Sequence, residues 1–137
     1  MLPDGLRSLP YLVHTNRELG LMLKGVKPMA MFGYTDGYEL EFALRYFRMF
    51  DRHVQTGRFE KTHKREPFRD GAFSHSLFYT LPGERWRVDA MLELLAVPGP
   101  WSNERERRYG TLLGYEDWQN DIWLKRYPVV PMTKAAD

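Results

Sequence analysis

Two patterns of apolar residues meet between positions 73 and 97, and the rest of the chain is predicted to be organised around that stretch. Apolar and aromatic residues first alternate with small polar ones, which is typical of a half-buried strand. The inward positions of that strand are Phe73, His75, Leu77, Tyr79 and Leu81. After Pro82-Gly83 the apolar spacing changes to i, i+3, i+4 and i+7, which predicts a helix over about 85–97. Because this helix is apolar over most of its circumference, it is predicted to be the central helix, packed on the sheet.

Shorter patterns before this stretch predict a helix and two further strands. Thr15-Asn16-Arg17-Glu18 has the form of a capping box and Gly25 suits a left-handed C-terminal cap, which predicts a helix over about 16–24. The apolar run at 28–34 predicts a buried strand, and Thr35-Asp36-Gly37 predicts a turn after it. The polar segment 58–66 is interpreted as an edge strand or a loop. Residues 1–13 are expected to form an irregular arm whose leucines pack on the body.

Residues 38–55 fit two patterns. Alternation from Tyr38 to Tyr46 matches a strand over 38–46, followed by a short helix over about 48–55. The same segment also fits one amphipathic helix that is capped by Asp36. Its inward residues would be Leu40, Leu44, Phe47 and Phe50. The turn at 35–37 favours the strand and short helix.

Two helices are predicted after the break at Pro98-Gly99-Pro100. Ser102 is a candidate N-cap for the first, which ends at Gly114, and the second runs over 115–127, with a tail from Val129. Together these elements predict a single α+β domain over residues 1–137. It would contain a small antiparallel sheet of three to four strands (near 28–34, 38–46, 58–66 and 73–81), helices packed on one face, and a C-terminal helix pair.

Composition excludes several classes of protein. The 137 residues are 43% hydrophobic and 15% aromatic, as expected for a globular protein rather than a disordered one. The absence of cysteine excludes disulfides, thiolate nucleophiles and cysteine zinc sites. No run of 18 apolar residues occurs, so we expect no membrane span and predict a cytoplasmic protein. The net charge of +2 is too small to indicate a partner.

Three segments, NRELGLMLKGVKPMAMF, LPGERWRVDAM and LLGYEDWQND, resemble a family of small uncharacterised bacterial proteins. They cover about a third of the chain. The resemblance implies no activity, ligand or partner, so candidate chemistry has to be sought in the residues themselves.

The histidines His63 and His75 are a first candidate for chemistry. If their strands are neighbours, the two imidazoles could hold a metal ion with Glu66 or Asp70 as third ligand. The alternative is a pair of partly exposed strand histidines with no common ligand. Because no closer cluster of ligands is found, we predict no metal site and no cofactor.

The helix at 115–127 is a second candidate, because polar residues fall within its aromatic face. Gln119 and Arg126 share that face with Tyr115, Trp118 and Trp123. An unsatisfied buried amide costs roughly 1–3 kcal/mol, so Gln119 needs a partner. In a structural interpretation Gln119 caps a backbone edge and Arg126 pairs with Asp89 or Glu93. In a functional one a pocket binds a planar or anionic ligand. The residues of that predicted ligand site are Tyr115, Gln119, Trp123, Arg126 and Asp89.

A third candidate is the segment Arg45–Arg69, in which eight basic residues and three acidic ones alternate with aromatic residues. Such a pattern suits a surface for single-stranded nucleic acid. The excess of positive charge is small, however, and the protein core also needs the aromatic residues. Nucleic acid is therefore not an expected partner.

No sequence motif identifies an activity: the chain has no glycine-rich phosphate loop, HExxH or G-x-S-x-G. The leading hypothesis is a non-catalytic binding or interaction module that self-associates as a two-fold homodimer. This hypothesis rests on the amount of large apolar surface, which is more than one small sheet can bury. The chain contains seven Met, eight Phe, eight Tyr and four Trp. In the opposing hypothesis the N-terminal arm and the tail cover that surface in a monomer. The alternative function is a small enzyme or small-ligand-binding protein with a pocket near the C-terminal helix.

Overall fold

The computed structural model describes residues 4–130, which form an α+β fold with three antiparallel strands and six helices. This confirms the predicted fold class, including the C-terminal helix pair. The elements are α1 (Asp4–Arg7), α2 (Glu18–Leu23), β1 (Met29–Thr35), α3 (Glu41–Gln55), β2 (Glu60–Arg69), β3 (Ala72–Thr80), α4 (Trp86–Ala96), α5 (Asn103–Leu113) and α6 (Asp117–Arg126). The chain divides into two compact units, a sheet unit (Pro28–Ala90) and a helical unit (Met1–Lys27 with Met91–Asp137). Helix α4 runs from one unit into the other.

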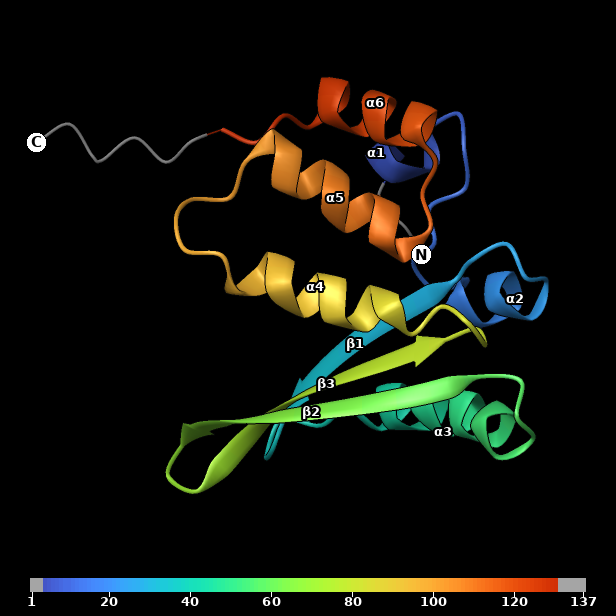
Figure 1. Cartoon of the computed structure of the whole chain (residues 1–137), viewed down its shortest axis with the longest axis vertical. Helices are drawn as coiled ribbons and strands as arrows, with labels where there is room; N and C mark the ends of the chain where they lie inside the picture. The colour runs from blue at the N-terminus through green and yellow to red at the C-terminus, as the bar shows by residue number, and fades with distance from the viewer. Residues whose placement is uncertain (1–3, 131–137) are drawn as a thin grey trace, which may run out of the picture. The chain divides into compact units, whose positions relative to one another are not determined.

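The sheet has the order β1-β3-β2, with both pairs antiparallel (Figure 1). The half-buried strand predicted at 73–81 corresponds to β3, which is the central strand of the sheet. β2 and β3 form a hairpin through Asp70 and Gly71, whose φ angles are 48° and 79°. Two successive residues of positive φ are typical of a type I′ turn, which matches the twist of the strands. Pro67 is tolerated within β2 because this strand lies at the edge of the sheet.

Helix α3 packs on one face of the sheet (Figure 1). The ring of Phe50 lies 4.7 Å from that of Tyr79 and 5.3 Å from that of Phe32, between ring centroids. Phe47 lies 5.2 Å from Phe32 in the same way. The buried Tyr79 donates a hydrogen bond of 2.8 Å to Asp51 Oδ1 of α3, which also accepts one of 2.9 Å from Lys61 of β2.

The prediction of a strand at 38–46 is wrong, and the alternative of one amphipathic helix is correct. One continuous helix replaces the predicted strand and short helix, and its Phe47 and Phe50 are buried against the sheet. Asp36 does not cap this helix; Leu40 is the N-cap residue and its side chain makes no capping bond. Three to four strands were predicted, and residues 4–130 form three.

In the helical unit α5 and α6 form the predicted pair. Ser102 caps α5 as expected, with its Oγ accepting from the Arg105 N–H at 3.2 Å, and Gly114 ends it with a φ of 104°. The helices approach closely where Asn120 donates to Thr111 Oγ1 at 3.1 Å. A Cβ atom at Gly110 would collide with Asn120 Oδ1, so this close approach requires glycine.

The predicted capping box at the start of α2 is not formed. The helix begins at Glu18 with Arg17 as N-cap residue and no side-chain capping bond. Asn16 takes a left-handed φ of 67°, which moves Thr15 away from the cap position. The predicted tail lies partly outside the described residues. Between residues 4 and 130 no helix is both long and apolar enough to cross a bilayer.

Candidate functional site

The ligand-site residues predicted on the C-terminal helix have partners within the helical unit. Gln119 Oε1 accepts from the Glu116 N–H at 2.8 Å, so its amide caps the start of its own helix. Arg126 donates to Gly5 O at 3.3 Å and to Ser8 Oγ at 3.0 Å. The backbone-capping interpretation of Gln119 is thus confirmed, while Arg126 binds the N-terminal arm instead of Asp89 or Glu93.

The N-terminal arm packs against two aromatic residues of the same helix region, of which Trp118 stays 47% exposed. The ring of Tyr11 makes edge contacts with Trp118 at 5.7 Å and with Tyr115 at 6.1 Å between centroids. Tyr115 OH accepts a hydrogen bond of 2.8 Å from the His14 N–H. Trp123 stands apart from these rings and lies 4.7 Å from Tyr127. Of the predicted site, Asp89 belongs to the sheet unit and the other four residues to the helical unit.

A buried cation holds the end of the arm. Lys27 is almost fully buried, and its Nζ donates to Leu113 O and to His14 Nδ1, the latter at 2.9 Å. The His14 ring stacks on Tyr115 with 3.8 Å between centroids and 9° between planes. Burial, together with the charge of Lys27, lowers the pKa of His14 to about 3. His14 is therefore neutral at pH 7, and its Nδ1 accepts from Lys27.

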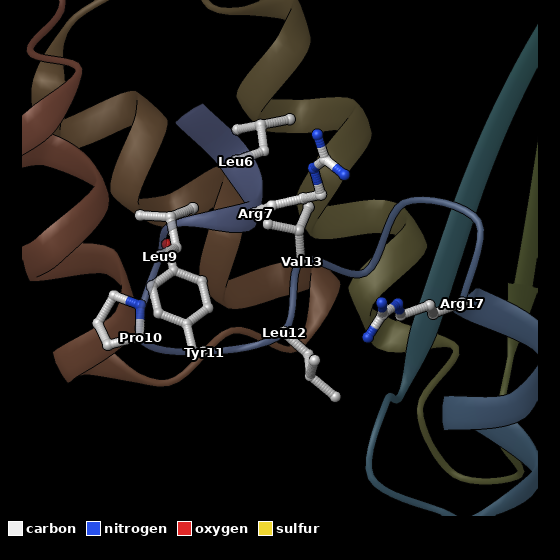
Figure 2. Close-up of a pocket in the computed structure, with 8 residues that line it drawn as sticks. All are labelled: Leu6, Arg7, Leu9, Pro10, Tyr11, Leu12, Val13 and Arg17. Atoms are coloured by element: carbon white, nitrogen blue, oxygen red, sulfur yellow. The ribbon is translucent and has the colours of Figure 1, made fainter. Parts of the chain in front are cut away.

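The arm itself forms a pocket of about 350 Å³ (Figure 2). Its lining residues are Leu6, Arg7, Leu9, Pro10, Tyr11, Leu12, Val13 and Arg17. Apolar side chains make up most of the wall, and the two charged residues are both arginines. Such a pocket suits an apolar ligand that carries an anionic group. No sequence pattern indicates this pocket, because its walls come from an irregular segment.

The sheet unit contains a chain of three hydrogen-bonded side chains, which we call the histidine chain: Asp36, His75 and His63. His75 Nε2 lies 2.8 Å from Asp36 Oδ1, and His75 Nδ1 lies 2.8 Å from His63 Nε2. Asp36 follows β1, His75 lies on the central strand β3 and His63 on the edge strand β2. The sequence correctly predicted that the two histidines lie close together. It missed Asp36, which was interpreted only as a turn or cap residue.

Hydrogen bonds determine the protonation of this chain. The Phe73 N–H donates to Asp36 Oδ2 at 2.9 Å, and this bond, followed by that from His75, lowers the pKa of Asp36. An ionised Asp36 only accepts, so His75 carries a proton on Nε2. Partial desolvation and then the charges of His75, Lys61 and Arg65 lower the pKa of His63. The pKa of His63 is thus held below its usual value, and one N–H···N bond joins the two rings.

The basic segment Arg45–Arg69 uses several of its cations within the sheet unit. The guanidinium of Arg65 lies 4.2 Å from the ring centroid of Phe73, and that of Arg69 lies 4.7 Å from Phe68. Lys61 pairs with Asp51 at 2.9 Å. These rings and cations are already paired with each other, which does not favour a platform for nucleic acid.

Comparisons with known proteins do not assign a role to these sites, because no family model, curated protein or solved structure matches the chain. The resemblance to small bacterial proteins therefore stays a prediction. Among residues 4–130, no group of three or more His, Asp or Glu side chains is arranged to hold a metal ion.

Proposed function

We propose that the protein is a non-catalytic interaction module that self-associates as a two-fold homodimer through the outward side of α3. The observation that carries this proposal is a group of exposed apolar side chains, the α3 surface: Tyr38, Leu40, Phe42 and Met49. Tyr38 and Phe42 are each 72% exposed, Leu40 is 57% and Met49 is 39%. Groups of large apolar side chains exposed on a folded protein are typical of interaction sites.

The periodicity of α3 explains why these residues face away from the sheet unit's core. Phe42 and Met49 are seven residues apart, or two helical turns, and so lie on one line along the helix. Phe47 lies about 140–160° and Phe50 about 80–100° around the helix from that line, and both are buried. Helix α3 therefore has large apolar side chains on two sides, and the sheet covers one of them.

Charge distribution favours a second copy of this chain as the occupant. Acidic Glu39 precedes the helix, and basic Arg52 lies in its last turn. In an antiparallel pair of α3 helices with a two-fold axis between positions 45 and 46, Phe42 would face Met49 of the second copy. The same axis would bring Glu39 beside Arg52 of the second copy. A two-fold interface of this kind is self-complementary.

Because the α3 surface has only four large apolar side chains, we expect association that depends on protein concentration rather than an obligate dimer. We also propose the cytoplasmic location that the sequence predicts.

Multi-angle light scattering over a concentration series tests the proposal. We expect a mass that rises from 16.3 kDa towards twice that value. Phe42→Glu should keep the mass at one chain, because it places a charge against Met49 of the second copy. Phe68→Glu is the matched control, since Phe68 is an exposed aromatic residue of the same unit on β2. A wild-type mass that stays at one chain on concentration would reject the proposal.

A charge exchange tests the geometry. Glu39→Arg and Arg52→Glu should each weaken association, and the double variant should restore it. If the double variant associates no better than the single ones, the antiparallel arrangement is wrong even when the wild-type chain dimerises.

The pocket of the N-terminal arm supports a second candidate function, the binding of a small apolar anion. Its two arginines and apolar wall are the specific observation. Calorimetric titration with octanoate should give saturable binding that Arg17→Gln weakens and that Arg108→Gln, at an exposed arginine of α5 in the same unit, leaves unchanged. Equal binding of octanoate and uncharged octanol would show that the arginines contribute no recognition.

A further inference from the structure

Two imidazole nitrogens point at each other near the edge of the sheet. The distance between His63 Nε2 and His75 Nδ1 is 2.8 Å, and the rings are inclined by 48°. In the antiparallel register His63 lies opposite Leu77, and His75 lies opposite Arg65. The two histidines are therefore diagonal neighbours on one face of the sheet.

Of the two rings, that of His75 is held in place. It is 9% exposed and stacks on Tyr34 with 4.4 Å between centroids and 9° between planes. Its Nε2–H donates to Asp36, so its Nδ1 lone pair points towards His63. A histidine that donates one ring N–H to a carboxylate and presents the other nitrogen is the arrangement found around protein-bound metals.

The ring of His63 can adjust. It is exposed on an edge strand, and its single proton can move from Nε2 to Nδ1 because imidazole has two neutral tautomers. Two nitrogens that each lie about 2.0–2.1 Å from one tetrahedral metal are roughly 3.3 Å apart. Because His75 is held in place, a tetrahedral ion on its Nδ1 lone pair would require His63 Nε2 to move sideways by about 2 Å, and this movement would replace the N–H···N bond with two metal bonds.

We propose that His63 and His75 form a two-histidine site for a late first-row divalent ion such as Cu²⁺, Ni²⁺ or Zn²⁺, with Asp36 orienting His75 from behind. Imidazole nitrogens suit these ions, and Cu²⁺ is bound most tightly in a site of given ligands. Water fills the remaining positions, since no third side chain of the described region completes a cluster. The prediction from sequence was that no metal binds; it did not include Asp36.

Neighbouring charges limit the affinity but do not exclude the ion. Lys61 and Arg65 lie near His63, and both oppose a cation. Each has a partner of its own: Lys61 pairs with Asp51 at 2.9 Å, and Arg65 stacks on Phe73. Together with the Asp36 carboxylate, these charges leave the surroundings of the pair close to neutral.

Titration of the full chain, without an affinity tag, by Cu²⁺ in a weakly coordinating buffer tests this site. Electron paramagnetic resonance should show one bound ion with hyperfine coupling to two imidazole nitrogens. His63→Ala should weaken binding at least tenfold, and it is the primary variant because His63 is exposed and its loss should not unfold the chain. His53→Ala, on α3, is the matched control and should change nothing.

Asp36→Asn examines the role of the carboxylate. Loss of such an outer partner typically weakens metal binding about 10–100-fold. The proposal would be overturned by Cu²⁺ binding of equal strength in His63→Ala, or by a spectrum without two coupled nitrogens. If Asp36→Asn binds Cu²⁺ as strongly as the wild-type chain, the two histidines bind the ion without help from Asp36. That result would contradict the proposed orienting role of Asp36.

Discussion

The two units each present aromatic residues on or beside a helix, and they differ in whether another segment of the same unit packs against those residues. In the helical unit Tyr115 and Trp118 are packed against Tyr11 of the N-terminal arm. In the sheet unit Tyr38 precedes α3 and Phe42 lies in its first turn, and each is 72% exposed. The sequence suggested a ligand surface at the first location, and the structure leaves the second one open.

The difference lies in what each surface can bury within its own chain. The arm is held by Arg126 at one end and by His14 and Lys27 at the other, so it lies across the helical unit. Within residues 4–130 the side chains on the outward side of α3 stay exposed. An aromatic pattern therefore indicates side chains that are favourable to bury. Only the folded structure shows which of them are packed against other segments of the chain.

The largest expected effect separates the two sides of α3. Phe50→Ala should lower the free energy of unfolding by about 3–5 kcal/mol, because a large fully buried aromatic side chain is lost. Phe42→Ala should change it by no more than about 0.5 kcal/mol, as is usual at the surface. Chemical denaturation of dilute protein measures both values. Similar losses in the two variants would show that Phe42 is also a core residue.

A smaller effect is expected when the cover of the helical unit is removed. Tyr11→Ala deletes two aromatic edge contacts, each worth about 0.5–1.5 kcal/mol, and should destabilise the protein by about 1–3 kcal/mol. Tryptophan emission should shift to longer wavelength as Trp118 becomes more hydrated. If neither stability nor emission changes, the arm does not cover this surface, and the comparison between the units fails.

Acid should weaken the same cover. The pKa of His14 is about 3 in the folded protein and near 6.5 when unfolded, so only the unfolded state takes up the proton between these values. Stability is thus complete above pH 6.5 and is lost as the pH falls towards 3, by at most about 1.4 kcal/mol per pH unit from this group. His14→Gln should remove this part of the pH dependence. An unchanged slope in that variant would assign the dependence to other groups.

Much of the fold could be predicted from local patterns. Alternation in β3, the cap at Ser102 and the glycine at 114 act over a few residues, and the structure shows each of them. The prediction of a strand over 38–46 was wrong because Leu40 and Leu44 fit both an alternating strand and the i, i+4 spacing of a helix. What decides between helix and strand there is the packing of Phe47 and Phe50 on β1 and β3, which local sequence does not contain.

The candidate sites were less predictable for the same reason. His63 and His75 could be paired because adjacent antiparallel strands were expected, but Asp36 reaches them from a turn 39 residues away from His75. A backbone partner was predicted for Gln119, and the structure shows that this partner is the start of its own helix. The contact of Arg126 with Ser8 joins opposite ends of the chain, and no periodic pattern predicts it.

The most direct test of the proposed function is an isotope-filtered nuclear Overhauser experiment on an equal mixture of labelled and unlabelled chains. Within one helix Phe42 and Met49 are separated by about 10.5 Å along the axis, too far for a strong contact between their side chains. The proposed dimer predicts contacts between the Phe42 ring of one copy and the Met49 methyl group of the other. If the only contacts between copies come from Trp118 or Trp123, the open surface lies in the helical unit and the proposed α3 dimer is wrong.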